Sequence, residues 1–232
     1  MSLVSDAARY AVYWAPEPAH PLWQRGCEWL GRDPSRSASG PPFRDATAEP
    51  RRYGFHATLT APMHLRPGAG EADFVAAVQT FASAATPFEM PALRVGLLER
   101  FVALLPKEAL PRDHALHRIA DACVHAFDSW RAPLDEHTLA RRLAGGALSS
   151  DQTLLLQRWG YPHVLDQWRF HMTLTDSLGA ASARQALRSE AQRFMARALT
   201  EPLRFESLCI FREPAPRAPF ELIQRFALAG RR

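Results

Sequence analysis

The chain has 232 residues, of which 47% are hydrophobic and 22% charged, and its formal net charge is +4. This composition excludes a disordered or fibrous protein and is typical of a globular one. The charge suits an anionic ligand but is too small to indicate a nucleic-acid partner by itself. No apolar run reaches the roughly 18 residues that a membrane-spanning helix needs. Asp6 and Arg9 interrupt any signal-peptide pattern, so we expect a cytoplasmic protein without membrane contact.

The three cysteines, Cys27, Cys123 and Cys209, lie far apart in apolar surroundings and form no CxxC motif. This spacing predicts buried free thiols in a reducing compartment rather than disulfides or a metal site.

The first half of the chain is predicted to run strand, helix, strand, helix, strand. Aromatic and β-branched residues indicate the strands, and apolar residues at helical spacing indicate the helices. The expected elements are a strand at Tyr10–Trp14, a helix at Pro21–Leu30, a loop at Pro34–Pro50, a strand ending near Pro62, a helix at Glu71–Ala85 and a strand at Leu93–Leu98.

The second half repeats this order and adds an insertion at about residues 131–167. We expect a strand at Arg100–Pro106, a helix at Asp113–Trp130, two insertion helices at Asp135–Leu143 and Asp151–Trp159, a motif strand, a helix at Ser182–Leu199 and strands at Leu203–Phe211 and Phe220–Leu228. A repeat of this length predicts one domain of two pseudo-symmetric lobes, at about residues 7–99 and 100–232.

One motif occurs in both halves. Phe55–Thr60 reads FHATLT and Phe170–Thr175 reads FHMTLT, so five of six positions are identical. Alternation along a strand places the apolar residues on one face and the histidine and threonines on the other. Repeated core packing explains the apolar positions but not the repeated polar ones. We therefore expect both polar faces to line one cavity.

Two imidazoles beside hydroxyl groups suit acid–base chemistry on a phosphate. Histidine titrates near neutrality, so one ring can accept a proton while the other donates one. Threonine hydroxyls can stabilise charge that develops on non-bridging oxygens. The candidate catalytic residues are His56, His171, Thr58 and Thr173, and the candidate substrate-binding residues are Thr60, Thr175, Arg169, Tyr13, Arg131 and Tyr161.

A metal site is the first rival interpretation. Neither motif strand carries a carboxylate on its polar face before Asp176, and threonine is a poor ligand for zinc. A second set of potential ligands, at His114, His117, Asp121 and His125, is interpreted as the solvated side of an amphipathic helix. We therefore expect neither a metal nor another cofactor.

Segments spread along the whole chain carry a resemblance to a known family. They read RYAVYWAP, PLWQRGCEWLGRDP, RRYGFHATLTAP, FDSWRAPL, LLLQRWGYPHV and WRFHMTLTDSL. With the paired His-x-Thr strands, they resemble the 2H phosphoesterase superfamily, and within it the DUF1045-type phosphonate metabolism proteins.

The resemblance implies an α+β fold with two pseudo-symmetric lobes of antiparallel-rich sheet, helices on the outer faces and a central cleft. It implies that His56 and His171 face each other across this cleft, with Thr58 and Thr173 binding phosphate. The implied activity is metal-independent hydrolysis of a cyclic phosphodiester of a small phosphorylated sugar or nucleotide, in phosphonate catabolism.

Two alternatives remain open. An RNA 2′,3′-cyclic phosphodiesterase or ligase-like enzyme would act on RNA ends, but the chain has one lysine, Lys107, and no dense basic and aromatic run. A non-catalytic nucleotide- or phosphate-binding module would bind its ligand without turnover. The sequence leaves open which histidine is the base, what the substrate is and how the chain oligomerises.

Overall fold

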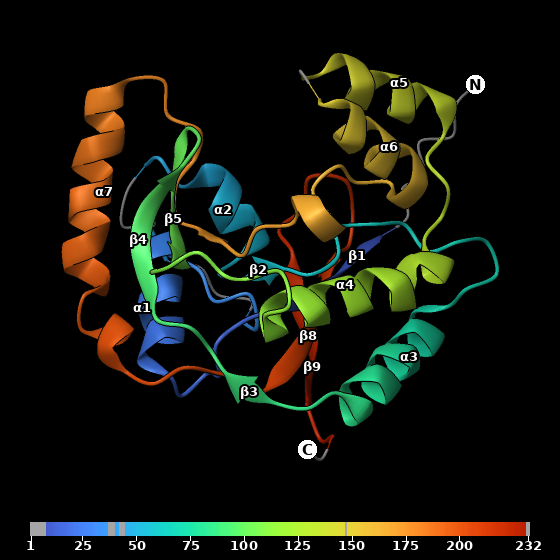
Figure 1. Cartoon of the computed structure of the whole chain (residues 1–232), viewed down its shortest axis with the longest axis horizontal. Coiled ribbons are helices and arrows are strands. Elements are labelled where there is room, and N and C mark those ends of the chain that lie inside the picture. The colour runs from blue at the N-terminus through green and yellow to red at the C-terminus, as the bar shows by residue number, and fades with distance from the viewer. Residues whose placement is uncertain (1–7, 37–39, 42–44, 147, 231–232) are drawn as a thin grey trace.

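Two antiparallel sheets form the centre of the molecule (Figure 1). The computed structural model describes residues 8–36, 40–41, 45–146 and 148–230, so Asp6 and parts of the predicted 34–50 loop lie outside the described residues. One sheet has the order β2-β1-β8-β9, the other β4-β5-β6, and β3 pairs with β7. The strands are β1 Arg9–Trp14, β2 Ala57–Thr58, β3 Phe88–Glu89, β4 Leu93–Leu98, β5 Phe101–Pro106, β6 Met172–Thr173, β7 Arg204–Phe205, β8 Ser207–Glu213 and β9 Glu221–Ala227.

The two sheets repeat the same pairing around the motif strands. Tyr13 of β1 lies opposite Thr58, and Ala103 of β5 lies opposite Thr173. On its other edge, β1 pairs with β8, and β5 pairs with β4. Each sheet therefore contains the last repeat strand of the other half of the sequence. The sheets consequently do not divide at residue 99, where the sequence analysis placed the boundary between lobes.

Helices cover the outer faces of both sheets, as predicted. In Figure 1, α3 (Glu71–Ala84) and α4 (Ala115–Phe127) lie beside β8 and β9, and α1 (Pro21–Leu30) and α7 (Ala181–Met195) lie beside β4 and β5. Aromatic contacts join the helices of each pair, because Phe74 packs on Phe127 with ring centroids 5.8 Å apart and Trp29 packs on Phe194 at 5.4 Å. The result is the predicted α+β arrangement.

The first helix of each half begins with a histidine cap. Nδ1 of His20 accepts the backbone N–H of Leu22, and Nδ1 of His114 accepts that of Leu116, over 3.0 and 3.1 Å. Such side-chain acceptors satisfy N–H groups that the first turn leaves unpaired. The duplication therefore extends to the helix caps.

The insertion folds as predicted into two helices, α5 (Glu136–Ala144) and α6 (Ser150–Trp159), which pack on each other at one side of the molecule (Figure 1). The remaining helical segments are α2 (Ala48–Tyr53) and the short 3-10 turns at Asp128–Trp130, Leu165–Gln167 and Ala198–Thr200. Helix α2 was not predicted and occupies part of the expected loop.

The cysteines are free thiols, as expected, with Cys123 and Cys209 buried and Cys27 partly buried. Within the described residues, no helix is long and apolar enough to cross a membrane.

Candidate active site

Both motif strands show the predicted division between an apolar and a polar face. In the first copy, Phe55, Ala57 and Leu59 are buried, whereas His56 and Thr58 are half-buried. In the second copy, Phe170, Met172 and Leu174 are buried, whereas His171 and Thr173 are half-buried. The imidazoles therefore stand at a surface that solvent and a ligand can reach.

The fold brings the two motif strands together. Cα atoms of β2 and β6 lie within 8 Å of each other. The indole of Trp168 donates to the carbonyl oxygen of Thr58 over 2.8 Å, and the indole of Trp29 donates to that of Leu174 over 2.7 Å. Each bond joins a tryptophan of one half to the motif strand of the other half, which fixes the two strands against each other.

Both histidines are held in the same way. Nδ1 of His56 lies 2.9 Å from the carbonyl oxygen of Gly54, and Nδ1 of His171 lies 2.9 Å from that of Arg169. A carbonyl oxygen only accepts, so each Nδ1 carries the proton and each neutral ring presents Nε2 as an acceptor. The hydroxyl of Thr58 lies 3.3 Å from Nε2 of His56. This places a donor and a proton acceptor side by side.

The surroundings keep the free imidazoles neutral. Burial lowers the pKa of His56 to about 4 against the opposing hydrogen bond to Gly54, and the charge of His171 acts in the same direction as burial. Burial also lowers the pKa of His171, which the carbonyl of Arg169 and the charge of Glu99 oppose. The two rings are therefore close enough to sense each other's charge. An anion bound between them would raise both pKa values again.

The outer threonines of the motifs were expected to contact substrate, and the structure corrects this. The hydroxyl of Thr60 accepts the backbone N–H of Val12 over 2.9 Å, and that of Thr175 accepts the N–H of Val102 over 3.0 Å. Both threonines are buried, with 7% and 1% exposed surface. Their hydroxyls replace strand-to-strand bonds that β1 and β5 would otherwise lack, so their role is structural.

Three of the other predicted residues lie around the histidines. Tyr13 stacks on His56 with ring centroids 3.7 Å apart. Tyr161, from the segment after α6, interacts electrostatically with Tyr13, and burial raises its pKa. Arg169 is exposed, and its charge lowers the pKa of His171. Tyr13 is 1% exposed, so it supports the ring of His56 and has little surface for a ligand, which corrects its predicted role. Contact of Tyr161 and Arg169 with substrate stays a prediction.

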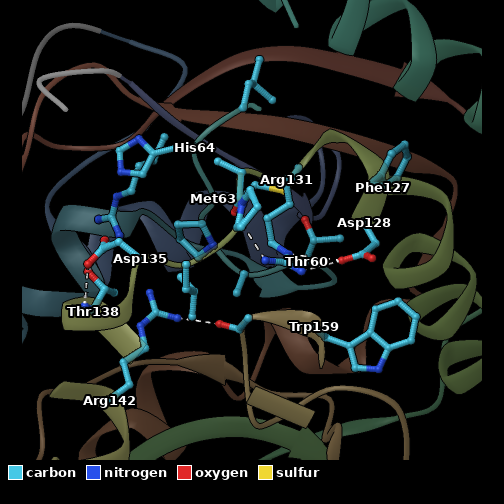
Figure 2. Close-up of a pocket in the computed structure, with 18 of the residues that line it drawn as sticks. Thr60, Met63, His64, Phe127, Asp128, Arg131, Asp135, Thr138, Arg142 and Trp159 are labelled. Carbon is cyan, nitrogen blue, oxygen red and sulfur yellow. Dashed lines mark hydrogen bonds and ion pairs between the residues drawn. The ribbon is translucent and has the colours of Figure 1, made fainter. Parts of the chain in front are cut away.

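Arg131 was also expected to meet substrate, but its guanidinium is already paired. It donates to the carboxylate of Asp128, with a shortest contact of 2.9 Å, and to the carbonyl oxygen of Arg158. Arg131 instead borders a cavity of about 800 Å³ between the insertion and the ends of β1 and β2 (Figure 2). His56 and His171 do not line this cavity, so it lies beside the histidine site rather than at it.

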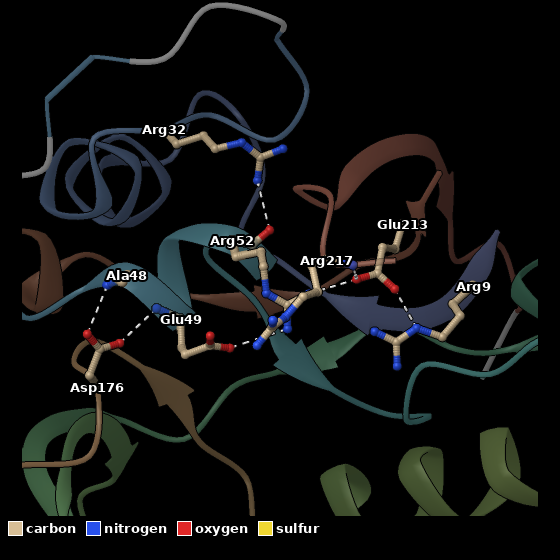
Figure 3. Close-up of polar contacts among 8 residues, drawn as sticks. All are labelled: Arg9, Arg32, Ala48, Glu49, Arg52, Asp176, Glu213 and Arg217. Atoms are coloured by element: carbon tan, nitrogen blue, oxygen red, sulfur yellow. Dashed lines mark hydrogen bonds and ion pairs between the residues drawn. The ribbon is translucent and has the colours of Figure 1, made fainter. Parts of the chain in front are cut away.

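Sequence reasoning missed a group of charged residues around Glu213 (Figure 3). Glu213, which is 1% exposed, pairs with Arg9 and, over 2.8 Å, with Arg52. The guanidinium carbon of Arg52 lies 4.2 Å from the ring centroid of Tyr53, and Tyr53 in turn packs 6.2 Å from His56. The sequence could have indicated Arg9, because alternation along the strand places it on the same face as Tyr13.

The histidine-rich face of α4 has roles that need no metal. His114 caps the helix, Asp121 pairs with Arg112 over 2.5 Å, and His125 packs edge-on against Trp159. Among the residues that the structure describes, no group of three or more histidine, cysteine or acidic side chains could hold a metal ion.

Comparison with known families decides the classification. The model of the family described as "Protein of unknown function (DUF1045)" matches residues 58–221. The chain belongs to the DUF1045 family. This confirms the family-level resemblance seen in the sequence. The match begins within the first motif and includes the whole second motif of this DUF1045 protein.

Two curated relatives of this DUF1045 chain carry the name "Ribose 1,5-bisphosphate phosphokinase PhnN". The protein from Janthinobacterium sp. (strain Marseille) is 39% identical over 235 residues, covering 96% of this chain and 51% of the relative. The protein from Laribacter hongkongensis (strain HLHK9) is 38% identical over 221 residues, covering 92% and 50%. The chain thus spans about half the length of the curated relatives it matches.

The solved structures with a similar chain path share little sequence identity with this chain. The chain resembles TT0787 of Thermus thermophilus at 17% identity and a TM-score of 0.47, covering 97% of this chain and 100% of that one. It resembles E. coli LigT in complex with NADP+ at 14% identity and a TM-score of 0.44, covering 97% and 99%.

Proposed function

We propose that this DUF1045 protein is a 2H-type phosphoesterase that hydrolyses a cyclic phosphodiester of a small phosphorylated sugar. The observation that carries the proposal is the paired geometry of His56 and His171. Both rings are half-buried on strands that approach within 8 Å, and both have Nδ1 bound to a carbonyl oxygen, which leaves Nε2 as the proton acceptor. Core packing alone does not require two such rings in one place.

In the proposed reaction, water attacks phosphorus while one histidine takes a proton from the water. A new P–O bond forms, and the bond between phosphorus and one ring oxygen breaks. The other histidine, protonated when the anionic substrate binds, gives its proton to the leaving alkoxide. The product is a phosphomonoester, and the proton count of the enzyme is restored by exchange with solvent.

The two motifs differ in ways that favour distinct roles. Tyr13 stacks on His56, whereas the corresponding position opposite Thr173 is Ala103. The Nε2 atom of His56 also lies 3.3 Å from the hydroxyl of Thr58. We assign the base role to His56, whose neutral ring is held in place by Tyr13, and the acid role to His171.

The inner threonines and Arg169 complete the proposed site. Thr58 and Thr173 have the same strand parity as the histidines, and their hydroxyls can donate to non-bridging oxygens. Arg169 can neutralise charge at the same phosphate. Tyr161 would form part of the wall that separates the reacting phosphate from solvent.

The names of the curated relatives support a sugar phosphate rather than a polynucleotide. Those proteins are named for a kinase that acts on ribose 1,5-bisphosphate, and this chain matches half of their length. We therefore place its activity in phosphonate catabolism, on a ribose-type phosphate.

The test is a hydrolysis screen with cyclic phosphates of ribose, of nucleotides and of short RNA 3′ ends. We expect turnover of a ribose cyclic phosphate that survives addition of EDTA. His56→Ala and His171→Ala should each reduce kcat at least about 100-fold. His125→Ala removes a histidine outside the site and serves as the matched control, with folding checked by circular dichroism.

Other outcomes of this screen would favour one of the alternatives or overturn the mechanism. Turnover of RNA ends alone would favour the RNA phosphodiesterase alternative. Binding of a cyclic phosphate without turnover, weakened equally by both histidine variants, would favour a non-catalytic module. Equal activity of His56→Ala, His171→Ala and the wild type would overturn the two-histidine mechanism.

A further inference from the structure

The lining of the 800 Å³ cavity beside the histidine site includes Arg9, Arg131, Arg141, Arg142 and Arg217. Figure 2 shows Arg131 and Arg142 among the lining residues. Arg9 comes from β1, and Arg142 comes from α5 of the insertion. Thr60, the last residue of the first histidine motif, and Gly160, directly before Tyr161, also line the cavity. It therefore borders on both sequence segments that lead to the proposed catalytic centre.

Arg142 is a half-buried cation whose hydrogen-bond partner is a neutral group. Its guanidinium donates to the carbonyl oxygen of Gly160 over 2.6 Å. In the described part of the chain, no carboxylate lies within ion-pair distance of it. Burial lowers its pKa, and the charges of Arg9, Arg141 and Arg131 lower it further. A partly buried charge among like charges is costly unless an anion binds there.

Arg9 of β1 also presents its guanidinium to the cavity, and a buried carboxylate fixes its position. Its Nε donates to the buried Glu213 (Figure 3), so the carboxylate holds the side chain. Within the described residues, its two terminal nitrogens have no hydrogen-bond partner and can bind a ligand. Arg131 differs, because Asp128 binds its Nε and one terminal nitrogen. Arg9 is thus anchored by a carboxylate, whereas Arg142 is held by a carbonyl oxygen, and the charge of Arg9 acts on Arg142.

Packed aromatic rings connect the cavity residue Arg9 to the histidine site. The guanidinium carbon of Arg9 lies 5.8 Å from the ring centroid of Phe220, and the ring of Phe220 lies 6.4 Å from that of Tyr13. Tyr13 is the residue that stacks on His56. Arg9 and His56 are thus separated by a short row of rings.

We propose that Arg9 and Arg142 bind a second phosphate group of the substrate whose cyclic phosphate lies between His56 and His171. This inference rests on the proposed function and narrows the substrate class to doubly phosphorylated sugars. Planar guanidinium groups match the oxygens of a phosphate and bind it through charge-assisted hydrogen bonds.

A nucleobase is a weaker fit to the same cavity. Trp159 is the tryptophan of the cavity lining on which a base could stack. The guanidinium carbon of Arg158 already lies 4.1 Å from the ring centroid of Trp159, and His125 meets the ring at 5.0 Å and 85°. These contacts occupy the stacking surface that a base would need.

The test compares two substrates across matched variants. Ribose cyclic phosphate and the same compound with a 5-phosphate are assayed with the wild type, Arg142→Gln and Arg142→Lys. We expect Arg142→Gln to reduce the ratio of kcat/KM for the doubly to the singly phosphorylated compound about 10- to 100-fold. Arg142→Lys, which keeps the charge, should recover part of this ratio. Arg193→Gln on the distant α7 removes one exposed positive charge and should leave the ratio unchanged.

Binding measurements separate this inference from the proposed function. Titration calorimetry with ribose 1,5-bisphosphate on the His171→Ala background should show weaker binding when Arg142→Gln is added, whether or not any cyclic phosphate is hydrolysed. Hydrolysis with an unchanged substrate ratio in Arg142→Gln would overturn the second-phosphate site and leave the proposed function intact. Tighter binding of mononucleotides than of the bisphosphate would also overturn it.

Discussion

Trp168 donates its indole N–H to the carbonyl oxygen of Thr58 over 2.8 Å, and so links the segment before the second histidine to the first motif. We expect Trp168→Phe, which keeps an aromatic ring but removes the donor, to lower kcat about tenfold because the two imidazoles lose their alignment. The unpaired carbonyl should reduce the free energy of unfolding by about 1 to 3 kcal/mol. Steady-state kinetics and urea unfolding measure the two effects. Trp130→Phe is the control, and an equal loss of kcat in that variant would contradict the alignment role.

Thr58 and Thr60 stand two residues apart in one motif but should respond differently to the same change. Thr60→Val leaves the buried N–H of Val12 without its acceptor, so we expect a loss of about 1 to 3 kcal/mol of stability. Thr58→Val removes a donor near Nε2 of His56 and should lower kcat about 100-fold with little change in stability.

Thermal unfolding and kinetics on both threonine variants provide the measurement, and each variant is the control for the other. A larger loss of kcat in Thr60→Val than in Thr58→Val would show that the outer threonine, after all, acts on substrate.

His56 should make stability depend on pH. Its pKa is about 4 in the folded chain and 6.5 for an ordinary histidine, so between these values the unfolded chain binds more protons. The stabilisation is fully present above pH 6.5 and is lost as the pH falls towards 4, at up to about 1.4 kcal/mol per pH unit. His171, whose pKa is also lowered, contributes with the same sign.

The measurement is urea unfolding at pH 7.5 and pH 5. His56→Gln should lose less stability between these two pH values than the wild type, because it lacks the titrating group. His125→Gln should behave as the wild type. The idea fails when His56→Gln and the wild type lose equal stability.

Removing the negative charge of Glu213 should destabilise the fold strongly. It is 1% exposed, pairs with Arg9 and Arg52, and accepts the backbone N–H of Arg217 over 3.0 Å. We expect Glu213→Gln to cost about 3 kcal/mol of unfolding free energy, because Arg9 loses its carboxylate and Arg52 keeps only the more exposed Glu49. Glu221→Gln removes an exposed carboxylate and should cost less than about 1 kcal/mol. Chemical denaturation of both variants measures the difference, and equal costs would rule out the buried network.

The duplicated motif made much of this fold predictable. Helix Pro21–Leu30 and strand Leu93–Leu98 have the predicted bounds, because their apolar spacing and their flanking glycines and prolines are local signals. Helix α2 was missed because its stabilising contact is not local. The carboxylate of Asp176 accepts the backbone N–H groups of Ala48 and Glu49 over 3.0 and 2.7 Å (Figure 3), across 128 and 127 residues of sequence.

The candidate site could also be predicted only in part. Strand parity identified the faces that carry His56 and His171, and the resemblance identified the family. Parity could not reveal that the hydroxyl of Thr60 accepts the backbone N–H of Val12, because this bond depends on the position of the neighbouring strand. For the same reason, the sequence alone could not distinguish Arg131, which Asp128 neutralises, from Arg142, which meets a carbonyl oxygen instead.

The exchange of β4 and β8 between the sheets has a consequence for the origin of the chain. A half-length ancestor folded in this way would have needed a second copy to supply the outer neighbour of its central strand. Such a homodimer would have carried two equivalent histidines. Every substitution in its gene would have altered both halves of the site at once. Gene fusion removes that constraint, and the helices α5 and α6 then belong to one side only. Covalent linkage thus allows the two sites to differ, so that Tyr13 stacks on His56 while Ala103 occupies the corresponding position opposite the second motif.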